Sequence, residues 1–334
     1  MVMEPPGHAP FRRTGVLVIG AGMSGLLAAC ELAAAGAEVL VVDKARGPGG
    51  RMATRRLGEA SLDHGAQFFT AHTRRFRDAL RSWQEQGLVE PWIGLPGTSR
   101  QDRVRWRGRP AMTAIPKHLA RDLDLLVEHR VTALEHRGEA WLASLHDGSV
   151  IEAQAVLLTA PLPQALDLVS TSGFRMSDIH SQLLARVGYE PCLAVLAQLD
   201  GPSDVPTPGW VEPTEGPLAS VADNHQKGVS RLSALTLHAT AQWSDEHFDC
   251  DVEWIASELL KAASPWLGSQ VSQYQVHRWR YSKSMSPLRL ACLQISSHPP
   301  LVLAGDAFGG PRVEGAALSG WAAAEVLLGT LMKD

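Results

Sequence analysis

The chain has 334 residues, of which 45% are hydrophobic and 20% charged, and its net charge is −4 with an isoelectric point near 6.4. These values are typical of a packed globular protein and provide no basic face for nucleic acid or for an anionic membrane surface. No apolar run reaches the ~18 residues of a membrane span, and residues 1–12 lack the apolar stretch of a secretory signal, so we expect a flexible extension at the start of a cytoplasmic protein.

The cysteines and histidines show no metal-binding pattern. The four cysteines (Cys30, Cys192, Cys250 and Cys292) are far apart and form no CxxC, and none of the 13 histidines stands in an HxH or HxxxH arrangement. The sequence therefore predicts reduced thiols and no metal site.

The first elements predict a nucleotide-binding fold. Residues 16–19 form a continuously apolar run, which is typical of a strand buried on both faces of a parallel sheet. A glycine-rich turn over residues 20–25 leads into an Ala/Leu-rich helix that Gly36 ends, and residues 38–42 make a second strand with Asp43 at its end.

Each glycine of this turn has a physical role. Gly20 permits the tight turn, Gly22 lets the backbone approach a pyrophosphate, and Gly25 lets the helix pack on the strand. The helix begins at Met23 and Ser24, where free N–H groups favour phosphate, and Asp43 is placed to accept hydrogen bonds from a ribose diol. A simple glycine-rich turn is the alternative, but the strand, helix and acid in this order favour a dinucleotide site.

A second glycine-rich loop distinguishes FAD from NAD. Lys44 opens a segment that continues through Gly49, Gly50, Arg51 and Met52. An NAD dehydrogenase does not need this loop, whereas the longer FAD does, with Arg51 neutralising the pyrophosphate. The alternative is a surface turn with a solvated arginine.

The middle of the chain changes character. Strands are predicted over residues 125–128, 131–134, 140–145 and 156–159, and Asp147-Gly148 marks a hairpin turn. Val131, the first residue of the second of these strands, is expected to contact the cofactor. Residues 166–276 are rich in Trp, Pro and short strands such as 193–199 and 232–238, with an amphipathic helix over 253–263, and we expect a substrate domain there.

The C-terminal segment supplies the second half of the cofactor site. An apolar strand over 301–304 ends in Gly305-Asp306, and Asp306 is placed for ribityl or phosphate-side hydroxyls. A further helix opens with Arg312, Val313, Glu314, Gly315 and Ala316 and is expected to direct its positive end at the flavin ring.

Several longer motifs resemble the amine-oxidase-type FAD superfamily and, within it, the bacterial renalases. They are residues 62–70 (LDHGAQFFT), 105–108 (RWRG), 112–115 (MTAI), 237–244 (LHATAQWS), 277–281 (HRWRY) and the GD…RVEG segment at 305–315. The resemblance implies an α/β fold of two domains, with a Rossmann-type FAD-binding domain and an inserted mixed-sheet substrate domain. The FAD-binding domain would comprise residues 13–71, 112–165 and 277–334, and the substrate domain residues 72–111 and 166–276.

The resemblance also implies an activity. Renalases oxidise the 2- and 6-dihydro isomers of NAD(P)H to NAD(P)⁺ with non-covalently bound FAD, and the reduced flavin passes its electrons to O₂, which gives hydrogen peroxide. The expected partners are therefore a dinucleotide substrate and O₂; the sequence carries no signal for a protein partner.

Five side chains are candidates for the substrate site. Gln67 follows the Gly65-Ala66 turn that passes beside the flavin in the family, Asn224 and His238 match polar family positions near the substrate, and Trp279 and Tyr281 are alternate residues on one strand face. Each has a plainer alternative: Gln67 as a turn cap, His238 as a satisfied core histidine, and the two aromatics as core packing. Arg55 and Arg312 bind phosphate or face water, and the local sequence does not decide between these roles.

Other functions remain open. A flavin amine oxidase is the first alternative, a non-catalytic FAD-binding redox sensor the second, and a desaturase or protoporphyrinogen-type enzyme a weaker third.

Overall fold

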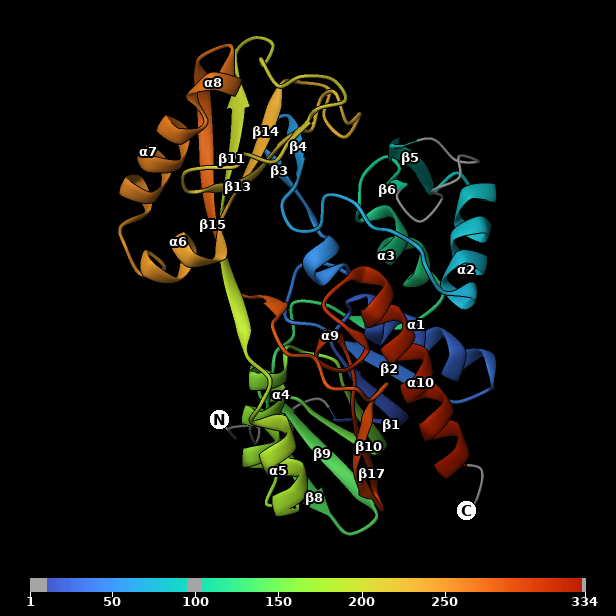
Figure 1. Ribbon diagram of the computed structural model, residues 1–334. Coiled ribbons are helices and arrows are strands. Elements are labelled where there is room, and N and C mark those ends of the chain that lie inside the picture. Colours follow the sequence, from blue (N-terminus) through green and yellow to red (C-terminus); the bar gives the residue numbers. More distant parts are fainter. Residues whose placement is uncertain (1–10, 95–103, 332–334) are drawn as a thin grey trace, which may run out of the picture.

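A large mixed sheet and a smaller antiparallel sheet organise the computed structural model, which describes residues 11–94 and 104–331 (Figure 1). The large sheet has the strand order β16-β17-β10-β1-β2-β7, and β9 pairs with β10 and carries β8. Its strands are β1 (Phe11–Ile19), β2 (Val39–Val42), β7 (Asp124–Leu126), β8 (Val131–Arg137), β9 (Ala140–Leu145), β10 (Val150–Leu158), β16 (Leu293–Ser297) and β17 (Pro300–Leu303).

The centre of this sheet is parallel and covered on both faces. Strands β17, β10, β1, β2 and β7 run parallel to one another, which places the early and late segments of the chain in one sheet. Along β1, Val16 and Val18 pack toward α1 (Met23–Ala34) and α10 (Val313–Leu331), while Leu17 and Ile19 pack toward β8, β9 and α4 (Leu162–Thr171). The continuous apolar run of residues 16–19 therefore reflects burial on both faces.

The smaller sheet is antiparallel throughout, with the order β12-β13-β14-β11-β15. Its strands are β11 (Tyr189–Leu199), β12 (Trp210–Val211), β13 (Leu218–Asp223), β14 (Ala234–Ala239) and β15 (Val271–Ser284). The helices α6 (Ala241–Glu246), α7 (Val252–Ala262) and α8 (Ser264–Leu267) follow β14, and side chains of α7 and α8 pack on one sheet face. Helix α7 begins where the Asp251 side chain accepts hydrogen bonds from the Glu253 and Trp254 amides. The mixed sheet expected for this domain is therefore wrong, because every pairing in it is antiparallel.

A hairpin joins the two sheets. Strands β3 (Thr54–Leu57) and β4 (Ala60–Asp63) extend from the large sheet to the smaller one, where Leu62 packs with Leu196 and Ala234 (Figure 1). The remaining elements are η1 (Gly50–Met52), α2 (Arg74–Glu85), β5 (Val89–Ile93), β6 (Arg105–Gly108), α3 (Ala114–Leu119), α5 (Asp178–Leu184) and α9 (Asp306–Gly309).

Three expected boundaries differ from the structure. Strand β1 begins at Phe11, so residues 11–12 belong to the sheet and only residues 1–10 of the expected extension lie outside the described part of the chain. Residues 166–188 belong with the large sheet, because Leu166, Phe174 and Met176 pack on its core. Strand β15 runs through the boundary expected at residue 277, so one 14-residue strand contributes to both regions.

The described residues between 72 and 111 contact both regions. Phe76, Trp83 and Trp106 form a core with Met23 of α1 and Trp321 of α10, beside the large sheet. Trp92 also packs against Trp210 of β12, and Arg105 pairs with Glu212 in the antiparallel-sheet region.

Within the described ranges, no helix is long and apolar enough to cross a membrane.

Candidate functional site

A cavity of about 1950 Å³ is lined by residues from both sheets. Pockets for a single drug-sized ligand have volumes of roughly 300–1,000 Å³, so this cavity has room for a large cofactor and a substrate together. The expected cofactor-binding residues that line it are Gly20, Gly22, Met23, Ser24, Asp43, Lys44, Gly50, Arg51, Met52, Gly65, Ala66, Val131, Gly305, Asp306, Arg312, Val313, Glu314 and Ala316. His238, Trp279 and Tyr281 of the expected substrate residues line it as well.

The turn before α1 forms an open cradle for phosphate. A Cβ built on Gly22 has no atom within 4 Å, so this backbone faces open space in the cavity. The N-terminus of α1 has no side-chain cap, which leaves its first N–H groups available to a ligand. The Ser24 hydroxyl is buried at this end of the helix and has no hydrogen-bond partner among the described residues. A phosphate oxygen would satisfy both the amides and the hydroxyl, and the cradle therefore fits FAD.

Two expected cofactor glycines act in packing and do not line the cavity. A Cβ on Gly25 would lie 2.0 Å from the Gly20 carbonyl oxygen, which confirms the close helix–strand contact predicted for Gly25. Gly315 lies against Gly309 and Gly310, where a Cβ would meet their carbonyl oxygens at 2.6 and 2.4 Å. Its Cα side is filled by backbone, so only glycine fits at this position, and its contact with the cofactor stays a prediction.

Asp43 holds the glycine turn as well as lining the cavity. Its carboxylate accepts hydrogen bonds from the amides of Ala21 and Ala45, both at 2.7 Å. A carboxylate has about four lone-pair sites, so acceptor capacity remains for the ribose diol expected there.

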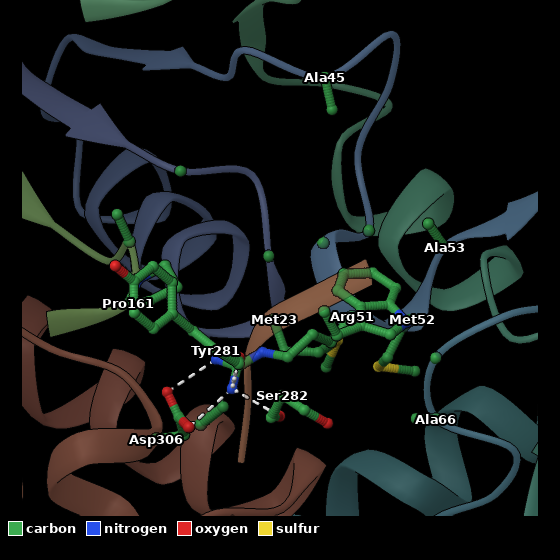
Figure 2. Close-up of a pocket in the computed structure, with 18 of the residues that line it drawn as sticks. Met23, Ala45, Arg51, Met52, Ala53, Ala66, Pro161, Tyr281, Ser282 and Asp306 are labelled. Carbon is green, nitrogen blue, oxygen red and sulfur yellow. Dashed lines mark hydrogen bonds and ion pairs between the residues drawn. The ribbon is translucent and has the colours of Figure 1, made fainter. Parts of the chain in front are cut away.

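Arg51 is paired with Asp306 rather than facing an open phosphate site. The guanidinium makes two parallel hydrogen bonds of 2.7 Å to the Asp306 carboxylate and donates to the carbonyl oxygens of Tyr281 and Ser282 at 3.4 and 3.1 Å (Figure 2). Burial alone would lower the Arg51 pKa, but the hydrogen bonds and charge of Asp306 raise it above its ordinary value. Arg51 therefore joins the GGR loop to α9 and β15, and its charge is largely compensated by Asp306.

The Glu314 side chain is likewise hydrogen-bonded within the protein. Its carboxylate accepts hydrogen bonds from the amides of His72 and Thr73 and from the Thr73 hydroxyl, at 2.6–3.2 Å. These bonds fix the start of α10 to the chain that follows β4, so only the backbone of Glu314 is free for a cofactor.

Three histidines and a tryptophan form one wall of the cavity, which we call the histidine wall: His64, His238, His277 and Trp279. The Trp279 ring lies 5.0 Å from the His64 ring and 4.3 Å from the His277 ring, between centroids. The carbonyl oxygen of His64 accepts hydrogen bonds from Trp279 Nε1 at 2.9 Å and from His238 Nε2 at 3.1 Å.

The histidines of this wall are held neutral. Burial lowers the pKa of His64 to about 3, and burial together with the charge of Arg55 lowers the pKa of His277 to about 4. Burial also lowers the pKa of His238. Because a carbonyl only accepts, His238 carries its proton on Nε2, and His64 carries its proton on Nδ1, which donates to the Ala53 carbonyl at 2.7 Å. The wall therefore presents uncharged imidazoles, with the tautomers of His64 and His238 set by these hydrogen bonds.

Gln67 and Asn224 do not reach the cavity, so the substrate contacts expected for them are wrong. Gln67 donates to the Asp63 carbonyl at 2.6 Å and accepts from the Lys227 ammonium at 3.0 Å. Asn224 is fully buried, accepts from the Asp63 amide at 3.0 Å and donates to Thr236 at 2.9 Å. Both amides satisfy a buried polar network centred on Asp63, directly behind the residues that line the cavity.

The sequence reasoning missed His64, His277, Asp63 and Lys227 as individual residues. His277 shares the alternate-residue pattern of Trp279 and Tyr281, and His64 directly precedes the Gly65-Ala66 turn, so both carried a local signal. No local signal distinguished Lys227. A lysine is almost never fully buried unless it is paired, and the sequence around Lys227 does not show its partner, Asp63.

The lining of the cavity is strongly cationic although the whole chain is acidic. Twelve lining residues are basic: Lys44, Arg46, Arg51, Arg55, Arg56, Arg105, Lys117, Arg130, Arg278, Arg280, Lys283 and Arg312. Five are acidic: Asp43, Asp167, Glu190, Asp306 and Glu314. This balance attracts anionic ligands such as dinucleotides.

Known proteins resemble this chain over most of its length. A family model described as "NAD(P)-binding Rossmann-like domain" matches residues 18–83. Mouse renalase (Mus musculus) is 23% identical over 319 residues, which cover 88% of this chain and 92% of that protein. Putrescine oxidase bound to putrescine has a TM-score of 0.70 at 14% identity, with 96% of this chain and 100% of that chain covered. A putative protoporphyrinogen oxidase from Exiguobacterium sp. has a TM-score of 0.69 at 12% identity, with 96% and 99% covered.

These results confirm the predicted fold class, the FAD cofactor and the assignment as an FAD-dependent oxidoreductase. The model for "Flavin containing amine oxidoreductase" matches residues 92–328, which is more than half of the chain, and the chain therefore belongs to that family.

Proposed function

We propose that this enzyme oxidises the 2- or 6-dihydro isomers of NAD(P)H with O₂, giving NAD(P)⁺ and H₂O₂ with uptake of one proton. FAD, bound without a covalent link, supplies the two-electron chemistry that connects the organic substrate with dioxygen. The similarity to mouse renalase along most of both chains supports this substrate class. The proposal includes a cytoplasmic location.

The observation that carries the proposal is the neutral histidine wall inside a cationic cavity. The cavity attracts the phosphates of a dinucleotide, while the three imidazoles add no positive charge beside the nicotinamide ring. Oxidation turns that ring into a cationic pyridinium, which charged imidazoles would disfavour.

The chain has little proton chemistry to perform. A dihydronicotinamide becomes aromatic when its hydride leaves, so no general base is required and orientation dominates the rate. Trp279 and His64 pack on each other and offer an aromatic surface to one side of a planar ring, and the Nε2 lone pair of His64 can accept a hydrogen bond from a carboxamide. Because the His64 carbonyl is fixed by both Trp279 and His238, this surface is preorganised.

The same features count against a cationic amine as substrate. Four of the five carboxylates that line the cavity already have partners: Asp43, Glu190, Asp306 and Glu314. The remaining one, Asp167, is exposed. Lys283, the lysine nearest to the expected aromatic segment, is 55% exposed and paired with Glu190.

Aerobic turnover against a matched substrate panel tests the proposal. The panel holds 2- and 6-dihydro-NAD, 2- and 6-dihydro-NADP, ordinary NADH, putrescine and a set of primary amines, and NAD(P)⁺ and H₂O₂ are measured. We expect equal amounts of both products from a 2- or 6-dihydro isomer and no peroxide from the amines. Peroxide from an amine, with none from the isomers, would show an amine oxidase, and no turnover with any donor would favour a redox-sensing role.

A further inference from the structure

Arg55 is an uncompensated cation in the cavity lining. It lies on β3, lines the cavity and is half-buried. Within residues 11–94 and 104–331 it makes no hydrogen bond or ion pair with another side chain, whereas Arg51, four residues earlier, is paired with Asp306. Burial and the neighbouring charge of Arg46 both lower the pKa of Arg55. An anion at this position would therefore relieve an unfavourable arrangement of charge.

Strand β15 provides a row of side chains that leads outward from the inner part of the cavity. Tyr281, Trp279, His277 and Gln275 are alternate residues and all line the cavity. The first three are half-buried, and Gln275 is exposed. With a rise of about 3.4 Å per residue the row spans about 20 Å, which is longer than a nicotinamide ring. If the nicotinamide ring of a ligand lies at the inner end of this row, the rest of the ligand extends along the outer end of the row.

Arg55 is on the hairpin that flanks this outer end. At the hairpin tip, Gly58 packs so closely on β15 that an added Cβ would lie 2.4 Å from Nε2 of Gln273. Strand β3 therefore runs beside the outer half of β15, and the charge of Arg55 acts on both His64 and His277. Arg55 therefore lies near the histidine wall, on the hairpin that flanks the outer half of β15.

We propose that Arg55, with Gln275 beside it, forms the subsite that binds a phosphate of the dinucleotide substrate, outside the ring pocket of the histidine wall. A guanidinium matches phosphate with two parallel hydrogen bonds, and a half-buried one does so with little competition from water. Gln275, the outermost of the four β15 side chains in this row, adds an uncharged donor. This inference rests on the proposed function, because it assumes a substrate with a phosphate beyond its nicotinamide ring.

The test compares a substrate that has phosphates with one that lacks them. Anaerobic stopped-flow measures the apparent Kd and the limiting rate of flavin reduction for 6-dihydro-NAD and for 6-dihydronicotinamide riboside. A charge-assisted hydrogen bond contributes about 1.5–3 kcal/mol, so Arg55→Met should raise the Kd for 6-dihydro-NAD about 10- to 100-fold. The limiting rate, the FAD content and the Kd for the riboside should remain those of the wild type.

Two further variants make the result specific. Arg55→Lys keeps the charge without the planar fork and should raise the Kd for 6-dihydro-NAD by a smaller factor. Arg77→Met removes one positive charge from an exposed position on α2 that does not line the cavity, and it should leave both values unchanged.

The outcomes separate this inference from the proposed function. If neither the 6-dihydro compounds nor the corresponding 2-dihydro compounds reduce the wild-type flavin, the proposed function is wrong and the subsite falls with it. If the dinucleotide and the riboside both reduce it and Arg55→Met changes neither Kd, or changes both equally, only the subsite is wrong. Loss of FAD in Arg55→Met would show that Arg55 binds the cofactor instead, which also overturns the inference.

Discussion

The ammonium nitrogen of Lys227 lies 2.8 Å from Oδ2 of Asp63, and neither side chain is exposed to solvent. Asp63 ends the β3–β4 hairpin, and Lys227 follows β13 in the antiparallel sheet, so the pair connects the two regions that enclose the cavity. Oδ1 of Asp63 also accepts from Thr54 and from the Met112 amide, and Lys227 lies 4.9 Å from the centre of the Trp92 ring. The pair is therefore fully buried and well satisfied.

Removing one member of this pair should destabilise the protein strongly. Lys227→Met leaves the Asp63 carboxylate buried without its counter-charge, and such a loss costs about 3–5 kcal/mol. We expect a lower denaturation midpoint, measured by near-UV circular dichroism in urea. Because two neutral partners avoid the buried charge, the double variant Asp63→Asn/Lys227→Met should recover part of the loss. A single variant as stable as the wild type would show that the ion pair contributes nothing.

Gly22→Val should separate cofactor binding from folding. The backbone at Gly22 has φ −84°, which valine adopts, and its Cβ meets no protein atom, so the fold should persist. The added side chain would fill the phosphate cradle, and we expect FAD to bind at least about tenfold more weakly because charge-assisted hydrogen bonds there are lost. FAD content and affinity are measured by flavin absorbance and fluorescence.

Gly25→Val is the contrasting variant. Its Cβ would lie 2.0 Å from the Gly20 carbonyl oxygen, so the protein itself should be destabilised. Full retention of FAD by Gly22→Val would contradict the position of the cradle.

Stability should decrease as the pH falls from about 6.5 toward 4. The pKa values of His64 and His277 in the folded protein are about 3 and about 4, below the ordinary 6.5. In this pH range the unfolded chain takes up protons that the folded protein excludes, so protonation favours unfolding. Thermal midpoints between pH 8 and 4 measure the effect. His277→Gln should make the dependence shallower, whereas His298→Gln, at an exposed position, should not.

Trp279→Phe should slow flavin reduction without releasing FAD. The change keeps an aromatic ring but removes the hydrogen bond from Nε1 to the His64 carbonyl. Because a small displacement of a reacting ring has a large effect on rate, we expect a decrease of about tenfold or more in the limiting rate of reduction. Trp254→Phe on α7, where the side chain is 42% exposed, provides the control. An unchanged rate in Trp279→Phe would mean that this bond does not position the wall.

The local patterns of the chain predicted the nucleotide-binding half well. The strand, glycine turn, helix and Asp43 follow one another within about one βαβ unit, and each role depends on near neighbours in sequence. The common side of His277, Trp279 and Tyr281 also follows from the two-residue period of a strand.

Long-range packing explains what the sequence did not reveal. Gln67 was expected at the substrate because it follows the Gly65-Ala66 turn, but Lys227, 160 residues later, occupies its amide oxygen. Composition placed residues 166–188 in the substrate domain, whereas Leu166 and Phe174 are bound to the large sheet by apolar contacts with residues from many elements. Such contacts depend on tertiary structure and leave no periodic signal.

An anaerobic titration of the purified holoenzyme with 6-dihydro-NAD tests the central claim most directly, with the visible absorbance of the oxidised flavin as the readout. The account predicts that one equivalent of the dinucleotide bleaches the flavin completely and yields one equivalent of NAD⁺. A flavin that stays oxidised with the 2- and 6-dihydro isomers of both dinucleotides, but is bleached by a primary amine, would contradict it.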